Sequence, residues 1–282
     1  MKILLTGSSG QLGQGLLPRV QKIGQVWAPL RSEFDLSHPE GLRSRIREFA
    51  PDLIVNAGAY TAVDRAEDEV DLCMRVNAEA PRVLAEESSR LGVAMIHYST
   101  DYVFDGKKAE PYTEQDGPNP LNVYGESKLK GEQAVLQTNE KSYVLRTSWV
   151  FDPAFGNNFY RTMMRLFREK TEISVVDDQF GRPTSVQFLV DQTIGLIKTG
   201  GNDCNQAPPD LGGLYHLAEM DRMSWADFAS WILRDEKSDD FICASINKVP
   251  SDEYSTQADR PRNSILCCDK WMKDVGDMQG DQ

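Results

Sequence analysis

A glycine-rich turn close to the N-terminus is the feature that most limits the folds open to this chain. Ile3-Leu4-Leu5 is an apolar run without polar alternation, which is typical of a buried parallel strand. It leads directly into Thr6-Gly7-Ser8-Ser9-Gly10-Gln11-Leu12-Gly13. Glycines at this spacing permit a tight turn, close approach of the backbone to a pyrophosphate, and close helix–strand packing. The turn therefore predicts a dinucleotide-binding βαβ unit, with a helix through about Val20 whose N-terminal amides face the phosphates. A plain tight turn is the alternative.

Further apolar runs predict the other strands of a parallel sheet, at 25–30, 52–56 and 93–98. Ligands of doubly wound sheets bind at the carboxyl ends of the strands. We therefore expect Ala57-Gly58-Ala59-Tyr60-Thr61 and Ser99-Thr100-Asp101 to lie at one edge of the sheet. His97, inside a strand, is interpreted as a core residue. Apolar residues at helical spacing predict helices at 64–74, 77–91, 158–168 and 225–234, and the aromatic and methionine residues of the last two are interpreted as core. Asn77 is expected either to contact the active site or to start its helix.

The end of the second predicted strand bears on the choice of cofactor. Dinucleotide folds often place an acidic residue there to hold the adenosine ribose. This chain has Ala28-Pro29-Leu30-Arg31 instead. An arginine can pair with a 2′-phosphate, which favours NADPH over NADH; an ordinary surface arginine is the alternative. Asp35, followed by Leu36, is expected to border the adenine pocket.

Tyr124 and Lys128 stand four residues apart in Asn122-Val123-Tyr124-Gly125-Glu126-Ser127-Lys128. Pro120 discourages helix before it, so we expect a helix to begin close to Tyr124 and to carry both side chains on one face. An ammonium near a phenol favours the phenolate, so Lys128 is expected to lower the Tyr124 pKa. A proton donor tuned toward neutral pH suits carbonyl reduction, and the Thr100 hydroxyl is placed to hydrogen-bond a substrate carbonyl oxygen. A solvated helix face is the alternative.

Bulk properties exclude several classes of protein. The chain has 282 residues and a net charge of -12, which argues against general binding to nucleic acid or to anionic membranes. No apolar run approaches the roughly 20 residues of a membrane span. The cysteines at 73, 204, 243, 267 and 268 are odd in number and irregular in spacing. Free thiols in a soluble, cytoplasmic protein are the simplest account, and no metal site is expected.

The combination of Gly7-x-x-Gly10-x-x-Gly13, a hydroxyl at a later strand end and Tyr124-x-x-x-Lys128 resembles the extended short-chain dehydrogenase/reductase family. That resemblance implies an α/β fold: a Rossmann-type doubly wound parallel sheet with a smaller C-terminal α/β substrate-binding lobe. We expect an NAD(P)-binding domain over 1–148 and a mainly substrate-binding lobe over 149–282. Elements near 184–199 and 213–218 are expected to dock back on the first domain.

More segments are similar to one branch of that family, the dTDP-4-dehydrorhamnose reductases: 55–64, 97–104, 120–125, 146–150, 156–159, 178–184, 213–217 and 260–264. This resemblance implies NADPH-dependent reduction (NADH being the alternative cofactor) of the C4 keto group of dTDP-4-dehydro-L-rhamnose to dTDP-L-rhamnose. That reaction is the last step of dTDP-rhamnose biosynthesis for cell-surface polysaccharide. Carried over residue by residue, Tyr124 is the catalytic acid and Lys128 its helper on the nicotinamide ribose, while Thr100 hydrogen-bonds the sugar near C4.

Binding roles follow from the same resemblance. Thr100 and Asp101 would touch the deoxysugar, and Trp149 would pack against the substrate. Since the substrate carries a diphosphate and the chain is acidic, Arg182 and Arg260 are candidate cation partners; surface salt bridges are the alternative. The cofactor-binding residues are expected to be Gly7, Gly10, Gln11, Leu12, Gly13, Arg31, Asp35, Leu36, Ala59, Tyr60, Thr61, Tyr124 and Lys128.

Departures from the pattern leave some properties open. Some relatives carry a glutamate at the position of Gly15 and use it in a magnesium-bridged dimer. We therefore carry over neither the metal nor that dimer, and expect a monomer or a homodimer. Two alternative functions keep the same fold. One is another nucleotide-sugar reductase or epimerase, and the other is a non-catalytic NADP-binding regulatory subunit such as that of methionine adenosyltransferase.

Overall fold

A six-stranded parallel sheet organises the computed structural model, which describes residues 1–199, 212–236 and 238–276. Its strand order is β10-β5-β4-β3-β1-β2, and every neighbouring pair is parallel. The order reverses direction between β1 and β3, as in doubly wound folds, so the predicted Rossmann-type fold is confirmed. The strands are β1 (Lys2–Thr6), β2 (Gln25–Trp27), β3 (Leu53–Asn56), β4 (Ala94–Thr100), β5 (Ser142–Thr147) and β10 (Gly213–His216).

The second strand is shorter than the sequence predicts. We expected it to continue to residue 30, but β2 ends at Trp27, which is the last residue in register with β1. Pro29 follows two residues later and has no backbone N–H to give to a ladder. The chain therefore leaves the sheet before Arg31, which places that arginine in a loop.

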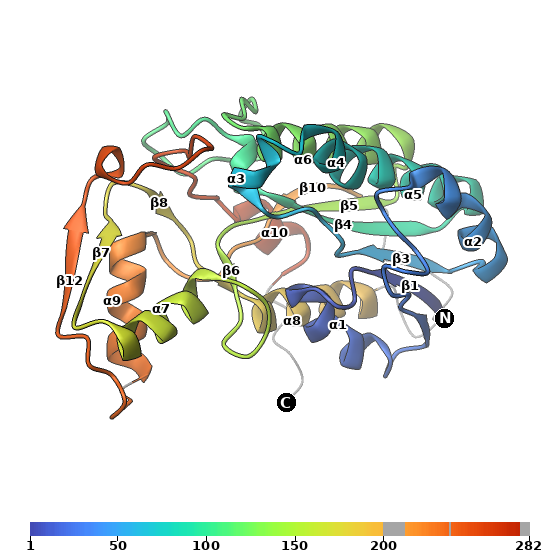
Figure 1. Ribbon diagram of the computed structural model, residues 1–282. Coiled ribbons are helices and arrows are strands. Elements are labelled where there is room, and N and C mark those ends of the chain that lie inside the picture. The colour runs from blue at the N-terminus through green and yellow to red at the C-terminus, as the bar shows by residue number, and fades with distance from the viewer. Residues whose placement is uncertain (200–211, 237, 277–282) are drawn as a thin grey trace.

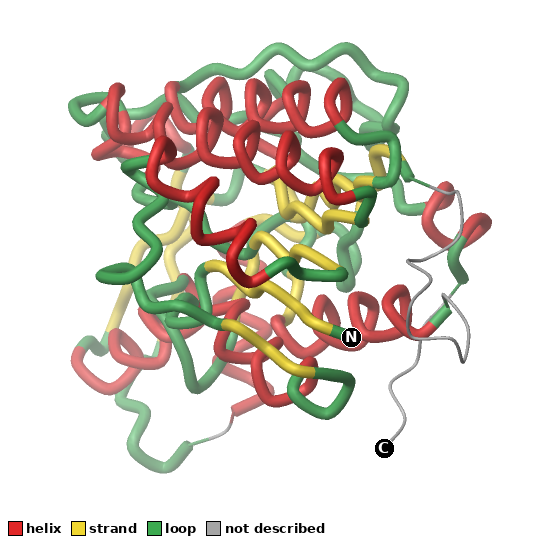
Figure 2. Tube along the Cα trace, turned by 90° about the vertical axis from the view of Figure 1, so that its right-hand side faces the viewer, coloured by secondary structure: helices red, strands yellow, loops and turns green. Residues whose placement is uncertain are grey.

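Helices cover both faces of this sheet (Figures 1 and 2). α1 and α8 bury residues such as Leu16 and Ile194 against the strands on one face. α2, α5 and α6 bury Ile46, Leu84 and Val135 against the other face. The bounds of these helices are α1 (Gln11–Val20), α2 (Leu42–Phe49), α5 (Ala80–Leu91), α6 (Val123–Thr138) and α8 (Val186–Lys198).

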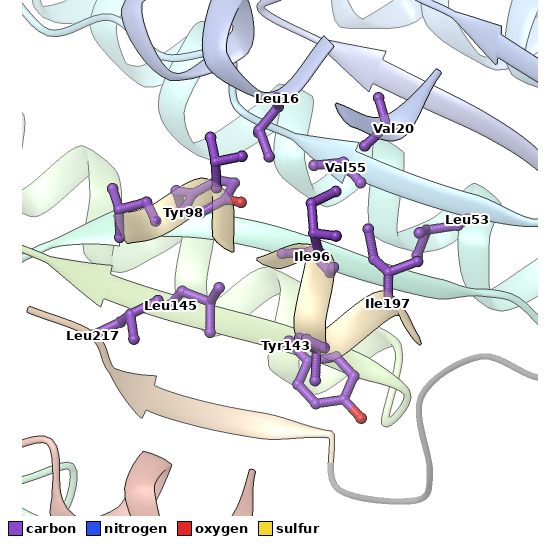
Figure 3. Packing of buried hydrophobic residues seen from close by; sticks show 14 of the residues in the cluster. Leu16, Val20, Leu53, Val55, Ile96, Tyr98, Tyr143, Leu145, Ile197 and Leu217 are labelled. Carbon is purple, nitrogen blue, oxygen red and sulfur yellow. The ribbon is translucent and has the colours of Figure 1, made fainter. Parts of the chain in front are cut away.

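The strands are apolar on both faces because both faces are covered. In β4, Ile96 belongs to the core under α1 and α8, whereas its neighbour Met95 belongs to the core on the opposite face. Figure 3 shows the first of these cores, in which Leu16, Val55 and Leu145 pack around Ile96. Full burial of each such side chain stabilises the fold by roughly 1.5–3 kcal/mol.

Elements from the second half of the chain return to the sheet. β10 pairs with β5 as its edge strand, and α8 packs beside α1. Gly15 of α1 makes that approach possible, since a Cβ added there would lie 2.5 Å from Val186 Cγ1. No helix in the described parts of the chain has the length and apolar character needed to cross a membrane.

A smaller lobe lies at the carboxyl ends of the strands (Figure 1). Its core joins Phe167, Ile173 and Phe228 from a strand pair and two helices. The parallel pair β7–β12 and the helices α7 and α9 form its body, with two short strand pairs beside them, whereas α10 packs on β10 and α8 of the sheet domain. Their bounds are β6 (Val150–Phe151), α7 (Phe159–Glu169), β7 (Glu172–Val176), β8 (Phe180–Gly181), β9 (Thr184–Ser185), β11 (Met223–Ser224), α9 (Trp225–Glu236), β12 (Ser245–Val249) and α10 (Asp269–Asp274).

The chain between β3 and β4 differs in detail from the two helices predicted there. It forms α3 (Val63–Ala66), α4 (Val70–Met74), a π-helical turn η2 (Arg75–Glu79) and then α5. The π turn carries Asn77, whose carbonyl oxygen lies against Gly131 of α6. A single π turn inside an α-helix is often found at a functional site. Within the described residues the chain also forms the short 3₁₀ turns η1 (Pro39–Gly41), η3 (Asp101–Val103) and η4 (Ser251–Glu253).

The contact between α6 and the π turn generates a stability prediction. A Cβ at Gly131 would collide with the backbone carbonyl oxygen of Asn77, which cannot rotate away as a side chain would. Gly131→Ala should lower the free energy of unfolding by about 1–3 kcal/mol despite the better helix propensity of alanine. Urea unfolding measures the change. Gly41→Ala is the matched control, because no atom lies within 4 Å of its added Cβ. A Gly131→Ala protein as stable as the Gly41→Ala protein would contradict the close packing.

Candidate active site

A cleft of about 950 Å³ opens at the carboxyl edge of the sheet, between the sheet domain and the smaller lobe. One wall is the glycine-rich turn and the loops after β2 and β3, and the other includes the loop before α7. Of the residues predicted to bind ligands, the cleft brings together Gly7, Gly10, Gln11, Leu12, Arg31, Asp35, Leu36, Ala59, Tyr60, Thr61, Thr100, Asp101, Tyr124, Lys128 and Trp149.

The glycine-rich turn fits a dinucleotide because side chains are excluded from it. Gly7 has φ +68°, and a Cβ there would lie 2.5 Å from the backbone nitrogen of Gly58. Gly10 precedes α1 in extended conformation, with no side-chain cap over the free amides of the helix. Gly13 is outside the cleft lining; its lack of a Cβ lets α1 pack on the carbonyl group of Gly7. Bare amides at a helix N-terminus form a site for phosphate groups.

Arg31 lines the cleft beyond the turn, where the second strand would have supplied an acid. Its side chain is 74% exposed, and Nε lies 3.5 Å from Asp35 Oδ1. A pair that long and exposed contributes little stability. The guanidinium is therefore free to exchange its partner for a phosphate group.

The loop after β3 is fixed from behind by the π turn. Asn77 is buried; its Oδ1 accepts from the backbone N–H of Tyr60 at 2.8 Å, and its Nδ2 donates to the carbonyl oxygen of Tyr60 at 3.0 Å. Asn77 Nδ2 also donates to Ser127 Oγ of α6 at 3.0 Å. The sequence left open whether Asn77 touches the active site or starts a helix. In the structure it does neither, and it ties the cleft-lining loop to the helix of Tyr124.

Tyr124 lies in the first turn of α6, at the predicted start of this helix. Asn122 caps the helix by accepting from the backbone N–H of Gly125 at 2.8 Å. The Tyr124 phenol is hydrogen-bonded to the hydroxyl group of Thr100, which comes from the end of β4. Burial raises the pKa of Tyr124 above its ordinary value, and the bond with Thr100 offsets only part of that rise. The prediction that Lys128 lowers this pKa is wrong for this structure, because the cost of burying a phenolate is larger.

Lys128 is buried one helical turn below Tyr124, and its Nζ donates to the carbonyl oxygen of Tyr98 at 2.6 Å. Burial lowers the Lys128 pKa to about 8, although the nearby carboxylate of Glu132 opposes that shift. Glu132 is itself buried and pairs with Arg146 at 2.7 Å. The ammonium group is thus anchored on strand β4 and held within reach of the cleft.

Buried oxygen atoms without partners collect at the end of β4 and β5. Within the described residues, Ser99 Oγ, Asp101 Oδ2 and Thr147 Oγ1 are buried and make no hydrogen bond of normal geometry. All three residues line the cleft. Buried polar atoms are almost always hydrogen-bonded, so these oxygens are available to a ligand. Thr100 Oγ1 donates to Asp101 Oδ1 at 3.1 Å, and burial raises the Asp101 pKa to about 7 although hydrogen bonds from Ser264 and Thr100 oppose that rise.

Two stacked tryptophans line the smaller-lobe side of the cleft. Trp149 and Trp225 lie with ring centroids 3.4 Å apart and ring planes 5° from parallel. Trp149 has φ +48°, a conformation that costs a bulky residue roughly 1–2 kcal/mol. Gly181 is required beside it, since a Cβ there would collide with the indole. The Trp149 ring stacks on Trp225 and both residues line the cleft, so the assignment of Trp225 to the core was incomplete.

The two predicted arginines lie outside the cleft lining. Arg182 donates to three backbone carbonyl oxygens, those of Met220 at 2.6 Å, Leu266 at 2.9 Å and Glu219 at 3.3 Å. It joins segments of the smaller lobe, so the prediction that it binds a diphosphate needs correction: most of its donors are already used.

Arg260 forms a two-point bond to Asp64, at 3.0 and 2.8 Å. These contacts agree with the alternative prediction for Arg260, a salt bridge, better than with binding of a diphosphate. Arg260 also hydrogen-bonds Tyr102, which lines the cleft and meets Tyr124 edge to face at 5.8 Å. Sequence reasoning missed Tyr102 as well as Asn157, Phe159 and Trp225. Tyr102 directly follows the predicted Thr100-Asp101, so its position in the motif was a usable signal, and Asn157 and Phe159 lie in the matching segment 156–159; Trp225 offered none.

A glycine turn after the first strand, with Thr100, Tyr124 and Lys128 at the same sheet edge, assigns the chain to the extended short-chain dehydrogenases/reductases. The profile of a family described as "RmlD substrate binding domain" matches residues 1–280. The chain is 40% identical over 279 residues to the dTDP-4-dehydrorhamnose reductase of Escherichia coli K12, covering 97% of this chain and 91% of that protein. It is 42% identical over 270 residues to the dTDP-4-dehydrorhamnose reductase of Burkholderia thailandensis, covering 94% and 90%.

Solved structures agree with these relatives. The dTDP-4-dehydrorhamnose reductase of Clostridium acetobutylicum superposes with a TM-score of 0.90 at 33% identity, covering 100% of this chain and 95% of that one. The enzyme of Bacillus anthracis, solved in complex with NADP, gives a TM-score of 0.87 at 32% identity, covering 99% and 95%. The chain belongs to the dTDP-4-dehydrorhamnose reductase family, and the family predicted from its motifs is confirmed.

The raised pKa of Asp101 generates a prediction about stability. Between the ordinary pKa of an unfolded aspartate, 3.8, and the folded value of about 7, the folded state binds more protons than the unfolded state. The wild-type protein should therefore lose about 2–3 kcal/mol of unfolding free energy between about pH 5 and about pH 8 through this group. Asp101→Asn stays neutral and should not suffer that loss. Its stability relative to wild type should rise with pH, as measured by urea unfolding.

Asp116→Asn is the matched control. A hydrogen bond from Lys108 holds the Asp116 pKa at about 2, so this group is ionised in both states throughout that pH range. Its substitution should shift stability by an amount that does not depend on pH. If the Asp101→Asn difference were equally independent of pH, the raised Asp101 pKa would be wrong.

Proposed function

We propose that this protein is an oxidoreductase that uses NADPH to reduce the C4 keto group of dTDP-4-dehydro-L-rhamnose, giving dTDP-L-rhamnose. The observation that carries the proposal is the meeting of Tyr124, Lys128 and Thr100 at one sheet edge, in the same cleft as the glycine turn. Membership of the reductase family supports the substrate, and the relative solved with NADP supports the cofactor. The reaction would complete dTDP-rhamnose synthesis for cell-surface polysaccharide.

The residues of the cleft divide the work of carbonyl reduction. NADPH, when bound, supplies the hydride. Tyr124 gives its phenolic proton to the carbonyl oxygen of the substrate, and its raised pKa keeps that proton in place until negative charge develops on the oxygen. The Thr100 hydroxyl, already bonded to Tyr124, stabilises the developing charge by hydrogen bonding. Lys128 holds a positive charge behind the phenol.

Other residues would bind the dinucleotide and the substrate and orient them. The bare turn around Gly7 and Gly10 accepts the pyrophosphate of the dinucleotide, and Arg31 pairs with its 2′-phosphate. The unpartnered Asp101 oxygen accepts from hydroxyl groups of the deoxysugar. The stacked pair Trp149 and Trp225 packs against the nucleotide part of the substrate. Arg260 would act on the substrate only indirectly, through its hydrogen bond to the cleft-lining Tyr102.

Three broader properties are part of the same proposal. Residues 1–148 form the cofactor-binding domain, and 149–282 form mainly the substrate lobe. The protein works in the cytoplasm, for which the free state of Cys73, Cys243, Cys267 and Cys268 is the support; Cys204 lies outside the described residues. It acts as a monomer or a homodimer.

The direct test is consumption of NADPH, followed by its absorbance, with dTDP-4-dehydro-L-rhamnose and with other dTDP-4-keto-6-deoxy sugars as substrates. Turnover with the first and much slower turnover with the others supports the proposed substrate. Turnover restricted to a different nucleotide sugar would assign the chain to another reaction of the same chemical class.

Tyr124→Phe tests the acid. The phenyl ring keeps its packing against Tyr102 but has no proton to give. We expect turnover to fall by about two to four orders of magnitude, with the dissociation constant of NADPH nearly unchanged. Tyr102→Phe is the control, because it removes a neighbouring buried phenol that is not bonded to Thr100, and its effect should be much smaller. A near-normal rate in Tyr124→Phe would falsify the role of Tyr124.

Arg31→Ala tests the choice of cofactor. Loss of a charged partner for the 2′-phosphate should raise the KM for NADPH about tenfold and leave the KM for NADH unchanged. Steady-state kinetics with both cofactors gives the two ratios. An exposed arginine outside the cleft, Arg165, supplies the control variant Arg165→Ala. Equal changes for NADPH and NADH would mean that Arg31 does not contact the 2′-phosphate.

A further inference from the structure

The side chain of Gln11 crosses from the cofactor turn to the smaller lobe. Its Nε2 donates to the carbonyl oxygen of Val150 in β6 at 3.0 Å. Its Oε1 accepts from Nδ2 of Asn158, the residue that caps α7, at 2.7 Å. Both partners lie more than a hundred residues further along the chain. Gln11 is thus the first helical residue after the glycine turn and, at the same time, a two-point link to the lobe.

The loop that Gln11 reaches is shaped around its side chain. Gly156 has φ +75°, and a Cβ added there would lie 2.7 Å from Gln11 Oε1 and 2.9 Å from Gln11 Cβ. Asn158 holds the same loop by donating to the carbonyl oxygens of Asp152 at 2.9 Å and Phe155 at 3.1 Å. Apart from a bond from Arg161 of α7 to the carbonyl oxygen of Gly156 at 2.8 Å, the loop depends on local turn bonds, and Phe155 at its tip is 39% exposed. A loop with few buried contacts has low local stability.

The other bond of Gln11 bears on the tryptophan pair. Val150 directly follows Trp149, which has φ +48° and whose indole ring stacks on Trp225. The carboxamide of Gln11 therefore holds the backbone next to that strained residue, while Asn157 and Gly156 of the linked loop line the cleft beside it. One side chain thus joins the backbone that receives a pyrophosphate to the two segments that form the lobe side of the cleft.

We propose that Gln11 is a positioning residue that couples the two halves of the cleft, so that dinucleotide and nucleoside diphosphate bind with positive cooperativity. A dinucleotide on the turn fixes the start of α1 and, through Gln11, orders the loop 152–157 and the Trp149–Val150 backbone. The second ligand then meets segments that are already ordered and does not bear that entropic cost. By linkage, the nucleoside diphosphate tightens dinucleotide binding by the same factor. This inference rests on the proposed function, because it assumes that the lobe side receives a dTDP group.

Calorimetric titration with dTDP, in the presence and absence of saturating NADP⁺, tests the coupling without turnover. For the wild-type protein we expect NADP⁺ to tighten dTDP binding by a factor of about 5–150. In Gln11→Ala this factor should fall close to one, and the same loss is expected in the reverse titration of NADP⁺. Asn158→Ser gives an independent variant, because serine keeps the helix cap but removes the donor to Gln11.

Gln14→Ala is the matched control. Gln14 lies in the same helix and donates to the carbonyl oxygen of Ser9 in the turn at 2.9 Å, but this bond does not cross to the lobe. The coupling factor should persist in this variant. Thermal unfolding shows whether each variant is folded. If Gln11→Ala does not fold, the titration of Asn158→Ser tests the role of Gln11 instead.

The outcomes separate the two proposals. Wild-type protein that binds dTDP equally well with and without NADP⁺ would overturn the coupling and leave the proposed function in place. Coupling that survives in both Gln11→Ala and Asn158→Ser would overturn the role of Gln11. Wild-type protein that binds no dTDP under either condition would overturn the proposed substrate class and the coupling with it.

Discussion

A buried ammonium group bonded to a strand is the interaction on which the geometry of the site depends. Lys128 Nζ donates to the carbonyl oxygen of Tyr98, so helix α6 is fixed on strand β4 two residues before that strand delivers Thr100. Burial of a charge is costly, and the fold tolerates it here because the Glu132–Arg146 pair lies one helical turn away. From this anchor follow the positions of Tyr124 at the start of α6 and of the Thr100 hydroxyl beside it. Asn77 fastens the same helix to the loop after β3, so the end of β4, the start of α6 and that loop are held together.

Local patterns predict well those parts of the molecule that local physics determines. The run before Gly7, the glycines themselves and the start of the Tyr124 helix after Pro120 were all placed correctly, because each depends on a few neighbouring residues. The end of β2 was misjudged by a few residues, where Pro29 stops the ladder sooner than hydrophobicity suggests. The helix predicted over 64–74 is split, since a pattern of apolar residues does not reveal where a helix is interrupted.

Properties that depend on distant segments were the ones that the sequence could not provide. Arg182 has the charge of a phosphate partner, yet carbonyl groups from segments near 220 and 266 take its donors. Trp225 has the spacing of a core residue, yet its ring stacks on Trp149 in the cleft. The Tyr124 pKa is raised by burial, which is a property of the whole fold and outweighs the effect predicted from the lysine four residues away. The family resemblance supplied the reaction, while only the assembled structure shows which side chains have donors and acceptors to spare.

The return of α8 and β10 to the first sheet has a consequence for how the molecule can move. The chain passes from the sheet to the lobe after β5, comes back through β9 into α8, and leaves again after β10. A two-body protein with a single connecting strand can swing open on one hinge. Here several chain segments connect the sheet domain to the lobe, so a rigid-body rotation of the lobe would need coordinated bending in every one of these segments. Ligand entry and release are therefore expected to rely on small local rearrangements of loops and side chains at the mouth of the cleft, while the two bodies stay nearly fixed.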